Sequence, residues 1–400
     1  MIMKALTKIS NGFLSLVAVA LWFTSCSSED VAQNGGGLNE KDQRVLLLSV
    51  NTGNLGTRST TALTPDEKQI NDMTVGIYDK SGNYRVVASL TSGATITEAS
   101  GTTPGTFTTT NGTNVKVVTS TLQKDDQVLV AVNRDDVAFT SKPSPTDFSN
   151  VTMAATKALQ FKASSTEIDA TKFPKFGKAT LPAGNNSTFT AIVNVKNLVS
   201  KVTLEDLSVL FTGPYASATF TPSEIFLLNV PDKLAFSETG QASTTTYLNG
   251  TDIDKNGGKT GTKTDVLATA TTRATALSSV SGGTASYTAK PILYTIPNSS
   301  TSDKTILVIT GKFKKDASAT EETVYYPLAL NENYDSSYPT GAAADGGTKS
   351  QTLAGKNYKC TVVIKTIGAS NPWVTTGPQT AELTVDVADW DDADQTTTFE

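Results

Sequence analysis

The chain is dominated by short apolar segments separated by stretches rich in Thr, Ser, Gly and Asn, and helical periodicity is almost absent. Such segments are typical of strands, in which side chains alternate between two faces. The first is VLLLSVN at Val45–Asn51, and the further strand candidates are Met73–Tyr78, Val128–Val132, Phe189–Val195, Lys201–Phe211, Ile225–Val230, Pro291–Ile296, Thr305–Phe313, Thr323–Leu330, Tyr358–Ile367 and Ala381–Ala388. Spaced strands without strand–helix alternation predict an all-β fold of packed β-sandwiches.

Two polar stretches and one turn interrupt this pattern. Thr91–Thr121 is rich in Thr and Gly and is predicted to form exposed hairpins, and Gly240–Gly283 is a long polar insertion. A helical turn is predicted at Pro65–Asn71, where Pro65 takes the first helical position and Thr64 is placed to cap it. Because 400 residues exceed what one hydrophobic core usually organises, two domains are expected, with their boundary near Asn194.

Composition excludes several function classes. Histidine is absent from the sequence, so catalysis by Ser-His-Asp or Cys-His arrangements is excluded. The net charge of −5 gives no basic footprint for nucleic acid. A calcium-loop start at Asp252–Gly257 fails at its twelfth position, where Lys263 replaces the required glutamate. We therefore expect no enzyme activity, no catalytic residue, no cofactor, no metal site and no nucleic-acid partner.

The N-terminal segment has the pattern of an export signal. Lys4 and Lys8 precede the apolar stretch Gly12–Phe23, which is too short to span a bilayer, and Ser25-Cys26 follows it. A small residue before cysteine at such a place resembles a lipobox, where cleavage follows acylation of the thiol. We expect residues 1–25 to be removed and Cys26 to be lipidated; the alternative is an ordinary secretory peptide with an incidental thiol. Cys360 lies in a strand-like pattern and is expected to be buried and inert.

A strand, a loop and an arginine follow the lipobox. The apolar residues of the first strand are Val45, Leu46, Leu47, Leu48 and Val50. The loop behind it, Thr52–Ser59, is rich in Gly and carries Arg58, one of five arginines among the 33 basic residues. Exposed loops of this composition are preferred sites of proteolytic cleavage. Arg58-Ser59 is therefore a candidate processing site, and the alternative is an arbitrary loop arginine.

The end of the chain has a second notable strand pattern. In Ala381–Ala388 the apolar residues Leu383, Val385 and Val387 alternate with polar ones. Trp390 follows, then an acidic run that ends at Asp394, which is typical of a solvated face. Gln395–Phe399 is another short strand candidate. These segments are either a detachable strand pair or the routine closing strand of the second domain.

At these residues the sequence resembles the FimA-type fimbrillins, the major subunits of Bacteroidetes type V pili. The similarity runs along the whole chain and depends on the order and spacing of its segments rather than on one motif. Besides the lipobox and the strand before Arg58, the segments that carry it are MTVGIY at Met73–Tyr78, QVLVAVN at Gln127–Asn133, TILVITGK at Thr305–Lys312, VYYPLALN at Val324–Asn331, NYKCTVVIKTIGASN at Asn357–Asn371 and LTVDVADW at Leu383–Trp390.

The resemblance implies two transthyretin-like β-sandwich domains with exchangeable N-terminal and C-terminal strands. Residues 1–25 would be the signal peptide, 26–58 the propeptide, 59–193 the first domain and 194–400 the second. An arginine-specific protease would cut at Arg58-Ser59 and release Val45–Asn51. A C-terminal strand of another subunit would fill the groove, and the candidate donor residues are Leu383, Val385, Val387, Trp390 and Phe399.

The resemblance also implies partners and a place in the cell. The partners are identical or related fimbrial subunits in a head-to-tail polymer, the protease, the outer membrane that holds the lipidated precursor, and a host or bacterial surface ligand. The expected role is a shaft subunit of a surface fimbria that supports adhesion, biofilm formation and virulence. The alternatives are a tip adhesin, a membrane-retained anchor or, more distantly, a glycan-binding surface lipoprotein.

Overall fold

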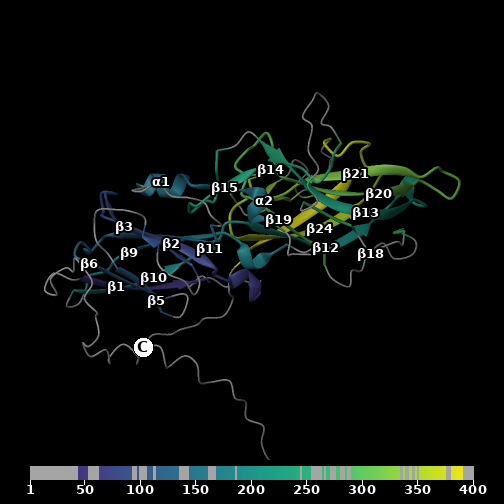
Figure 1. The fold of residues 1–400 in the computed structure, drawn as a ribbon. Coiled ribbons are helices and arrows are strands. Elements are labelled where there is room, and N and C mark those ends of the chain that lie inside the picture. The colour runs from purple at the N-terminus through teal and green to yellow at the C-terminus, as the bar shows by residue number, and fades with distance from the viewer. Residues whose placement is uncertain are drawn as a thin grey trace, which may run out of the picture. The chain divides into compact units, whose positions relative to one another are not determined.

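The computed structural model confirms that the chain is nearly all β (Figure 1). The residues it describes are 44–52, 63–91, 97–98, 106–110, 114–134, 144–160, 168–184, 187–243, 246–253, 264, 267–270, 276–279, 284–285, 290–333, 337, 342–344, 347–348, 351–374 and 380–390. Over these residues no helix is both long and apolar enough to cross a membrane.

The first half of the chain forms two sheets that share one core. The four-stranded sheet has the order β10-β1-β6-β5, with bounds β1 Arg44–Asn51, β5 Thr106–Thr110, β6 Asn114–Thr119 and β10 Thr188–Asn194. The six-stranded sheet has the order β11-β9-β7-β2-β3-β4, with bounds β2 Asp72–Tyr78, β3 Tyr84–Thr91, β4 Thr97–Glu98, β7 Gln127–Val132, β9 Lys175–Thr180 and β11 Lys196–Asn197. This arrangement is the expected pair of packed sheets.

The second half forms another pair of sheets. One has the order β18-β12-β24-β25, and β19 also pairs with β12; the bounds are β12 Ser200–Val209, β18 Thr284–Ala285, β19 Ile292–Thr295, β24 Lys356–Ile364 and β25 Ala381–Asp389. The other has the order β17-β13-β20-β21, with bounds β13 Thr219–Leu228, β17 Ala268–Ala270, β20 Ile306–Lys314 and β21 Glu322–Ala329. Their large core also includes Tyr78, Leu129 and Phe176 of the six-stranded sheet, so that sheet is buried on both faces.

Short elements complete the described chain. Three small sheets pair β8 with β15, β14 with β16, and β22 with β23. The bounds are β8 Thr152–Ala154, β14 Val230–Pro231, β15 Lys233–Ala235, β16 Tyr247–Leu248, β22 Glu332–Asn333 and β23 Ala342–Ala343; the helical elements are α1 Pro145–Asn150, α2 Ala155–Ala158, η3 Asp66–Lys68, η4 Ala170–Lys172 and η5 Gly213–Tyr215.

The polar stretch Thr91–Thr121 departs from its expected role. Strands β5 and β6 do form a hairpin, but β6 also pairs with β1 inside the sheet. Val115 and Val117 lie on the face of β6 that packs into the core and are buried, whereas Lys116 and Val118 lie on the opposite face. The prediction of a wholly exposed hairpin is therefore wrong for β6, whose few valines all fall within the strand.

Candidate functional site

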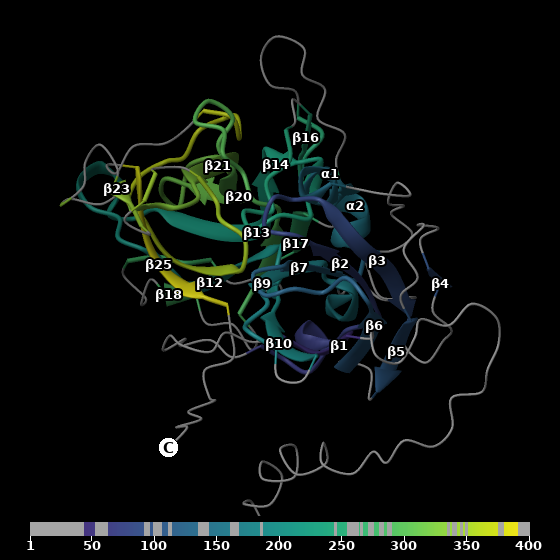
Figure 2. The same ribbon diagram turned by 90° about the vertical axis from the view of Figure 1, so that its left-hand side faces the viewer.

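The strand expected to be removable, β1, lies in the middle of its sheet (Figure 2). It runs parallel to β10, from Val45 opposite Thr188 to Asn51 opposite Asn194. On its other side it runs antiparallel to β6, where Leu47 lies opposite Lys116. We call the space that β1 occupies between β10 and β6 the strand slot. Because both edges of β1 are paired, its removal would expose two rows of backbone donors and acceptors.

The inward face of β1 is apolar and fully buried. Leu46, Leu48 and Val50 are 0, 1 and 1% exposed and pack into the core shared with the six-stranded sheet. Burial of a large apolar side chain contributes roughly 1.5–3 kcal/mol, so the three together contribute on the order of 5–9 kcal/mol. Val45 and Leu47 are half-buried on the outer face. The slot therefore selects a strand with apolar residues at every second position.

The chain is anchored soon after the predicted cleavage site Arg58-Ser59. Cys26, Arg58 and Ser59 lie outside the described residues, and the described chain resumes at Leu63, which is buried. The predicted turn is present but shorter than Pro65–Asn71: η3 spans Asp66–Lys68, and Pro65 precedes its first residue. The Thr64 N–H donates to Glu67 Oε2 at 2.8 Å, and the Glu67 N–H donates to Thr64 Oγ1 at 3.3 Å. Thr64 and Glu67 thus cap the turn reciprocally.

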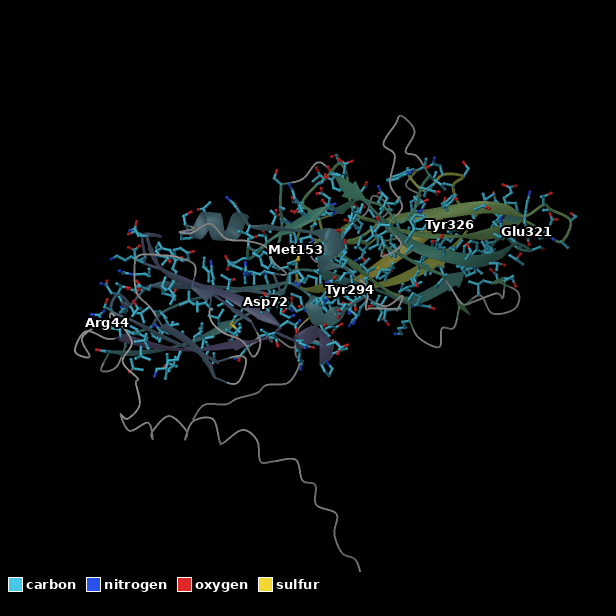
Figure 3. The ribbon with its side chains drawn as sticks, in the orientation of Figure 1. Arg44, Asp72, Met153, Tyr294, Glu321 and Tyr326 are labelled. Atoms are coloured by element: carbon cyan, nitrogen blue, oxygen red, sulfur yellow. The ribbon has the colours of Figure 1, made fainter. Side chains whose placement is uncertain are left out.

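The Glu67 carboxylate joins this turn to the second pair of sheets. It is 2% exposed and accepts hydrogen bonds from Lys201 Nζ at 3.2 Å and from Trp390 Nε1 at 3.3 Å. The Tyr294 hydroxyl, labelled in Figure 3, donates to it at 3.4 Å. These partners belong to β12, β19 and the residue after β25. Buried charges need such compensation, and this cluster holds residues after the loop in place independently of β1.

A second buried cation lies close to Glu67. Lys175 is 1% exposed, and its Nζ donates to the carbonyls of Phe173 at 3.0 Å and Gln69 at 3.1 Å. Burial lowers the pKa of Lys175 from 10.5 to about 7, and the nearby Glu67 charge opposes that shift. No local sequence pattern marks a charged residue that tertiary packing buries, so the sequence does not predict the roles of Glu67, Lys175 and Lys201.

The C-terminal strand β25 lies at the edge of the β18-β12-β24-β25 sheet. It pairs along its whole length with β24, from Ala381 opposite Ile364 to Asp389 opposite Lys356. Leu383 and Val385 are 1 and 3% exposed, and Val387 is half-buried. The alternation predicted for this strand is confirmed. The Val385 N–H points away from β24 and donates to Asn333 Oδ1 at 2.6 Å.

Trp390 fixes the end of β25. It is fully buried, and its backbone N–H donates to the Gly355 carbonyl at 2.9 Å. The Phe173 ring packs against the Trp390 ring, with centroids 5.7 Å apart. Lys201 Nζ lies 5.5 Å from the centre of the Trp390 ring, within the range of a cation–π contact. Phe399 lies outside the described residues. Release of β25 would therefore break contacts within its own subunit as well as form new ones.

The Cys360 thiol and the carboxylates are the remaining groups that could react or bind a metal. Cys360 is buried, as expected, and burial raises the pKa of its thiol to about 12, which makes the thiolate inaccessible at neutral pH. Among the described residues no group of three or more Asp, Glu or Cys residues is placed to hold a metal ion.

Comparison with solved structures shows that other proteins share this fold. No protein-family model and no curated protein matches the chain. Similar solved structures include a fimbrilin, FimA, from Porphyromonas gingivalis W83, with a TM-score of 0.58, 14% identity, and coverage of 88% of this chain and 98% of that one. A proposed cell adhesion protein from Bacteroides eggerthii has a TM-score of 0.57 and 19% identity, covering 89 and 98%. One from Parabacteroides distasonis has a TM-score of 0.56 and 14% identity, covering 87 and 100%.

Proposed function

We propose that this chain is the shaft subunit of a cell-surface fimbria that supports adhesion and polymerises by donor-strand exchange. The observation that carries the proposal is the central position of β1, an apolar strand paired on both edges. In the sequence it is followed by a Gly-containing polar segment with Arg58. A vacated slot of this kind is a template for strand addition. The similar folds of a fimbrilin and of proposed cell adhesion proteins agree with this function.

Maturation takes two steps in this proposal. The precursor is lipidated on Cys26 and carried to the outer membrane, and an arginine-specific protease then cuts between Arg58 and Ser59. The mature chain loses five basic and four acidic residues, so its net charge changes from −5 to −6. The anchoring of the chain from Leu63 onward supports a cut at this place, because the Glu67 contacts do not involve β1.

The donor in this proposal is Ala381–Glu400 of another subunit, and β25 is its first candidate. Both β1 and Ala381–Ala388 have eight residues. When they are aligned, Leu383, Val385 and Val387 take the inward places of Leu46, Leu48 and Val50. Gln395–Phe399 is the second candidate, with Phe399 as its inward apolar residue. The two-domain division at residue 194 and the transthyretin-like topology belong to the same proposal.

The alternative within this class is a tip adhesin or a membrane-retained anchor. An anchor would keep its lipid and need no usable cleavage site, and a tip would need no donor strand. Arg58 and the alternating strand β25 favour the shaft.

The test is processing and assembly of the purified precursor by an arginine-specific protease. We expect a new N-terminus at Ser59 and fibres visible by electron microscopy. Arg58→Ala should stay monomeric with its N-terminus unchanged, whereas the control Arg273→Ala should assemble like the wild type. Normal fibres from Arg58→Ala would refute the assignment.

A further inference from the structure

A pocket joins the end of the strand slot to the end of β25. Its cavity volume is about 310 Å³. Asn194, Val195 and Lys196 line it on the side where β1 ends, and Gly355, Lys356 and Asp389 line it on the side where β25 ends. The Val195 N–H donates to the Asn51 carbonyl at 2.8 Å, so a chain that continues beyond Asn51 leaves the slot beside this pocket.

Close packing of β9 on β10 shapes the wall of the pocket. A Cβ atom on Gly177 would lie 2.4 Å from the Asn194 carbonyl oxygen, so a larger residue cannot stand there without a shift of the backbone. The Oδ1 atom of Asn194 is buried and has no hydrogen-bond partner among the residues that the structure describes. A buried unpaired acceptor is costly, and a backbone N–H from an incoming chain would satisfy it.

The pocket carries more positive than negative side chains. Lys178, Lys196 and Lys356 line it, together with Glu238 and Asp389. Lys178 Nζ pairs with Glu238 Oε2 at 2.6 Å, and Lys356 Nζ pairs with Asp389 Oδ1. The second pair depends on the subunit's own β25. If β25 leaves, three lysines face one carboxylate.

The alignment of donor and slot brings acidic residues to this place. If Ala381–Ala388 of a second copy replaces β1 in the same direction, Ala388 takes the place of Asn51. The next six residues, Asp389–Asp394, then leave the slot beside the pocket. They carry four aspartates and no basic residue. Six extended residues reach about 20 Å, enough to cross a cavity of this size.

We propose that the pocket binds the acidic run Asp389–Asp394 of the donating subunit, and that this run displaces the subunit's own Asp389 from Lys356. The inference rests on the proposed strand exchange. Acceptance of one strand thereby weakens the hold on the other, so a subunit that has received a strand releases its own more readily. The pocket couples the two ends of the subunit and favours ordered head-to-tail growth.

The test uses synthetic peptides on the full chain cut between Arg58 and Ser59, in which each peptide has to displace the cleaved β1. The chain is tethered sparsely to a surface, so that subunits cannot meet. The short peptide is Ala381–Ala388 and the long peptide is Ala381–Asp394. A third peptide is the long one with the four aspartates of the acidic run, Asp389, Asp391, Asp392 and Asp394, replaced by asparagine. The acceptor variant is Lys178→Gln with Lys196→Gln. Its matched control is Lys312→Gln, an exposed lysine on β20.

We expect the long peptide to bind about tenfold more tightly than the short one at low salt, and the advantage to shrink as salt rises. The asparagine peptide and the acceptor variant should each lose this advantage, and the control should keep it. Binding of the long peptide, and not of the short one, should also speed amide hydrogen exchange in β25.

Two results would overturn the inference. If both peptides bind equally, or if the long peptide keeps its advantage on the acceptor variant, the pocket does not bind the acidic run, although strand exchange itself stands. If neither peptide binds the cut chain, β25 is not the donor, and this inference fails together with that part of the proposed function.

Discussion

A disulfide across the strand slot should stop assembly reversibly. The Val45 N–H donates to the Ser187 carbonyl and the Asn51 carbonyl accepts from the Val195 N–H, and Ser187 and Val195 flank β10. The alternate residue Leu47 therefore also turns its backbone toward β10. Leu47 and Lys116 of β6 therefore form a non-hydrogen-bonded antiparallel pair, whose Cα atoms lie about 4.5 Å apart. This separation suits a disulfide, and the double variant Leu47→Cys with Lys116→Cys should form one.

The structure gives the scale of what this bond adds. The inward side chains of β1 contribute on the order of 5–9 kcal/mol, and backbone pairing on both edges adds to that. At 1.4 kcal/mol per factor of ten, spontaneous departure of cleaved β1 is disfavoured by roughly four to six orders of magnitude. Release of β1 thus requires a competing strand, and a covalent bond removes that route.

The assay measures fibre formation after protease treatment by light scattering and electron microscopy. The oxidised double variant should be cut normally, keep β1 attached in a non-reducing gel and form no fibres. Added reductant should restore assembly. The single variants Leu47→Cys and Lys116→Cys control for loss of the side chains. Wild-type growth of oxidised protein with β1 still attached would refute the exchange mechanism.

Three further predictions follow from particular residues. Cys26→Ala should lose labelling by an alkyne fatty acid, which the wild-type precursor should acquire; equal labelling would refute lipidation at this residue. Glu67→Gln should lower the free energy of unfolding, measured by urea titration, by about 3–5 kcal/mol, because it leaves Lys201 buried without its counter-charge. The control Glu238→Gln, which breaks an exposed ion pair, should lower it by less than about 1 kcal/mol. Between about pH 7 and 10.5 unfolded Lys175 binds a proton that the folded lysine has released, so the free energy of unfolding should rise with pH by a few kcal/mol in total across this window; the rise should be absent in Lys175→Met.

The sequence predicted most of the long strands, because their patterns are local, but it did not predict β3 and β9. The alternation in Ala381–Ala388 appears as the burial pattern of β25, and Pro65 with Thr64 marked the turn η3. The runs at Met73–Tyr78 and Val128–Val132 lack clean alternation because the six-stranded sheet is buried on both faces. Such a run identifies a strand, but it does not indicate which of the strand's two faces packs against which of the two cores.

The candidate site depended on pairings between distant segments, which no local pattern encodes. VLLLSVN predicted a buried strand, but nothing in it tells that β10 and β6 flank it. The same limit applies to Glu67, whose partners Lys201 and Trp390 stand far away in the chain. Lys116 and its neighbours were expected in an exposed hairpin, because the few valines of β6 are diluted by threonines around them.

The most direct test of strand exchange is a disulfide between donor and acceptor in the assembled fibre. In the proposed alignment Thr384 takes the place of Leu47, so it lies opposite Lys116 of the receiving subunit. A subunit with Lys116→Cys and Thr384→Cys should therefore give a ladder of covalent multimers after cleavage, assembly and oxidation, and only monomers when β1 is uncut. A variant with Glu382→Cys in place of Thr384→Cys, two residues out of register, should link poorly. Fibres that form without any Lys116–Thr384 ladder, or a ladder from uncut subunits, would contradict the claim that β25 replaces β1.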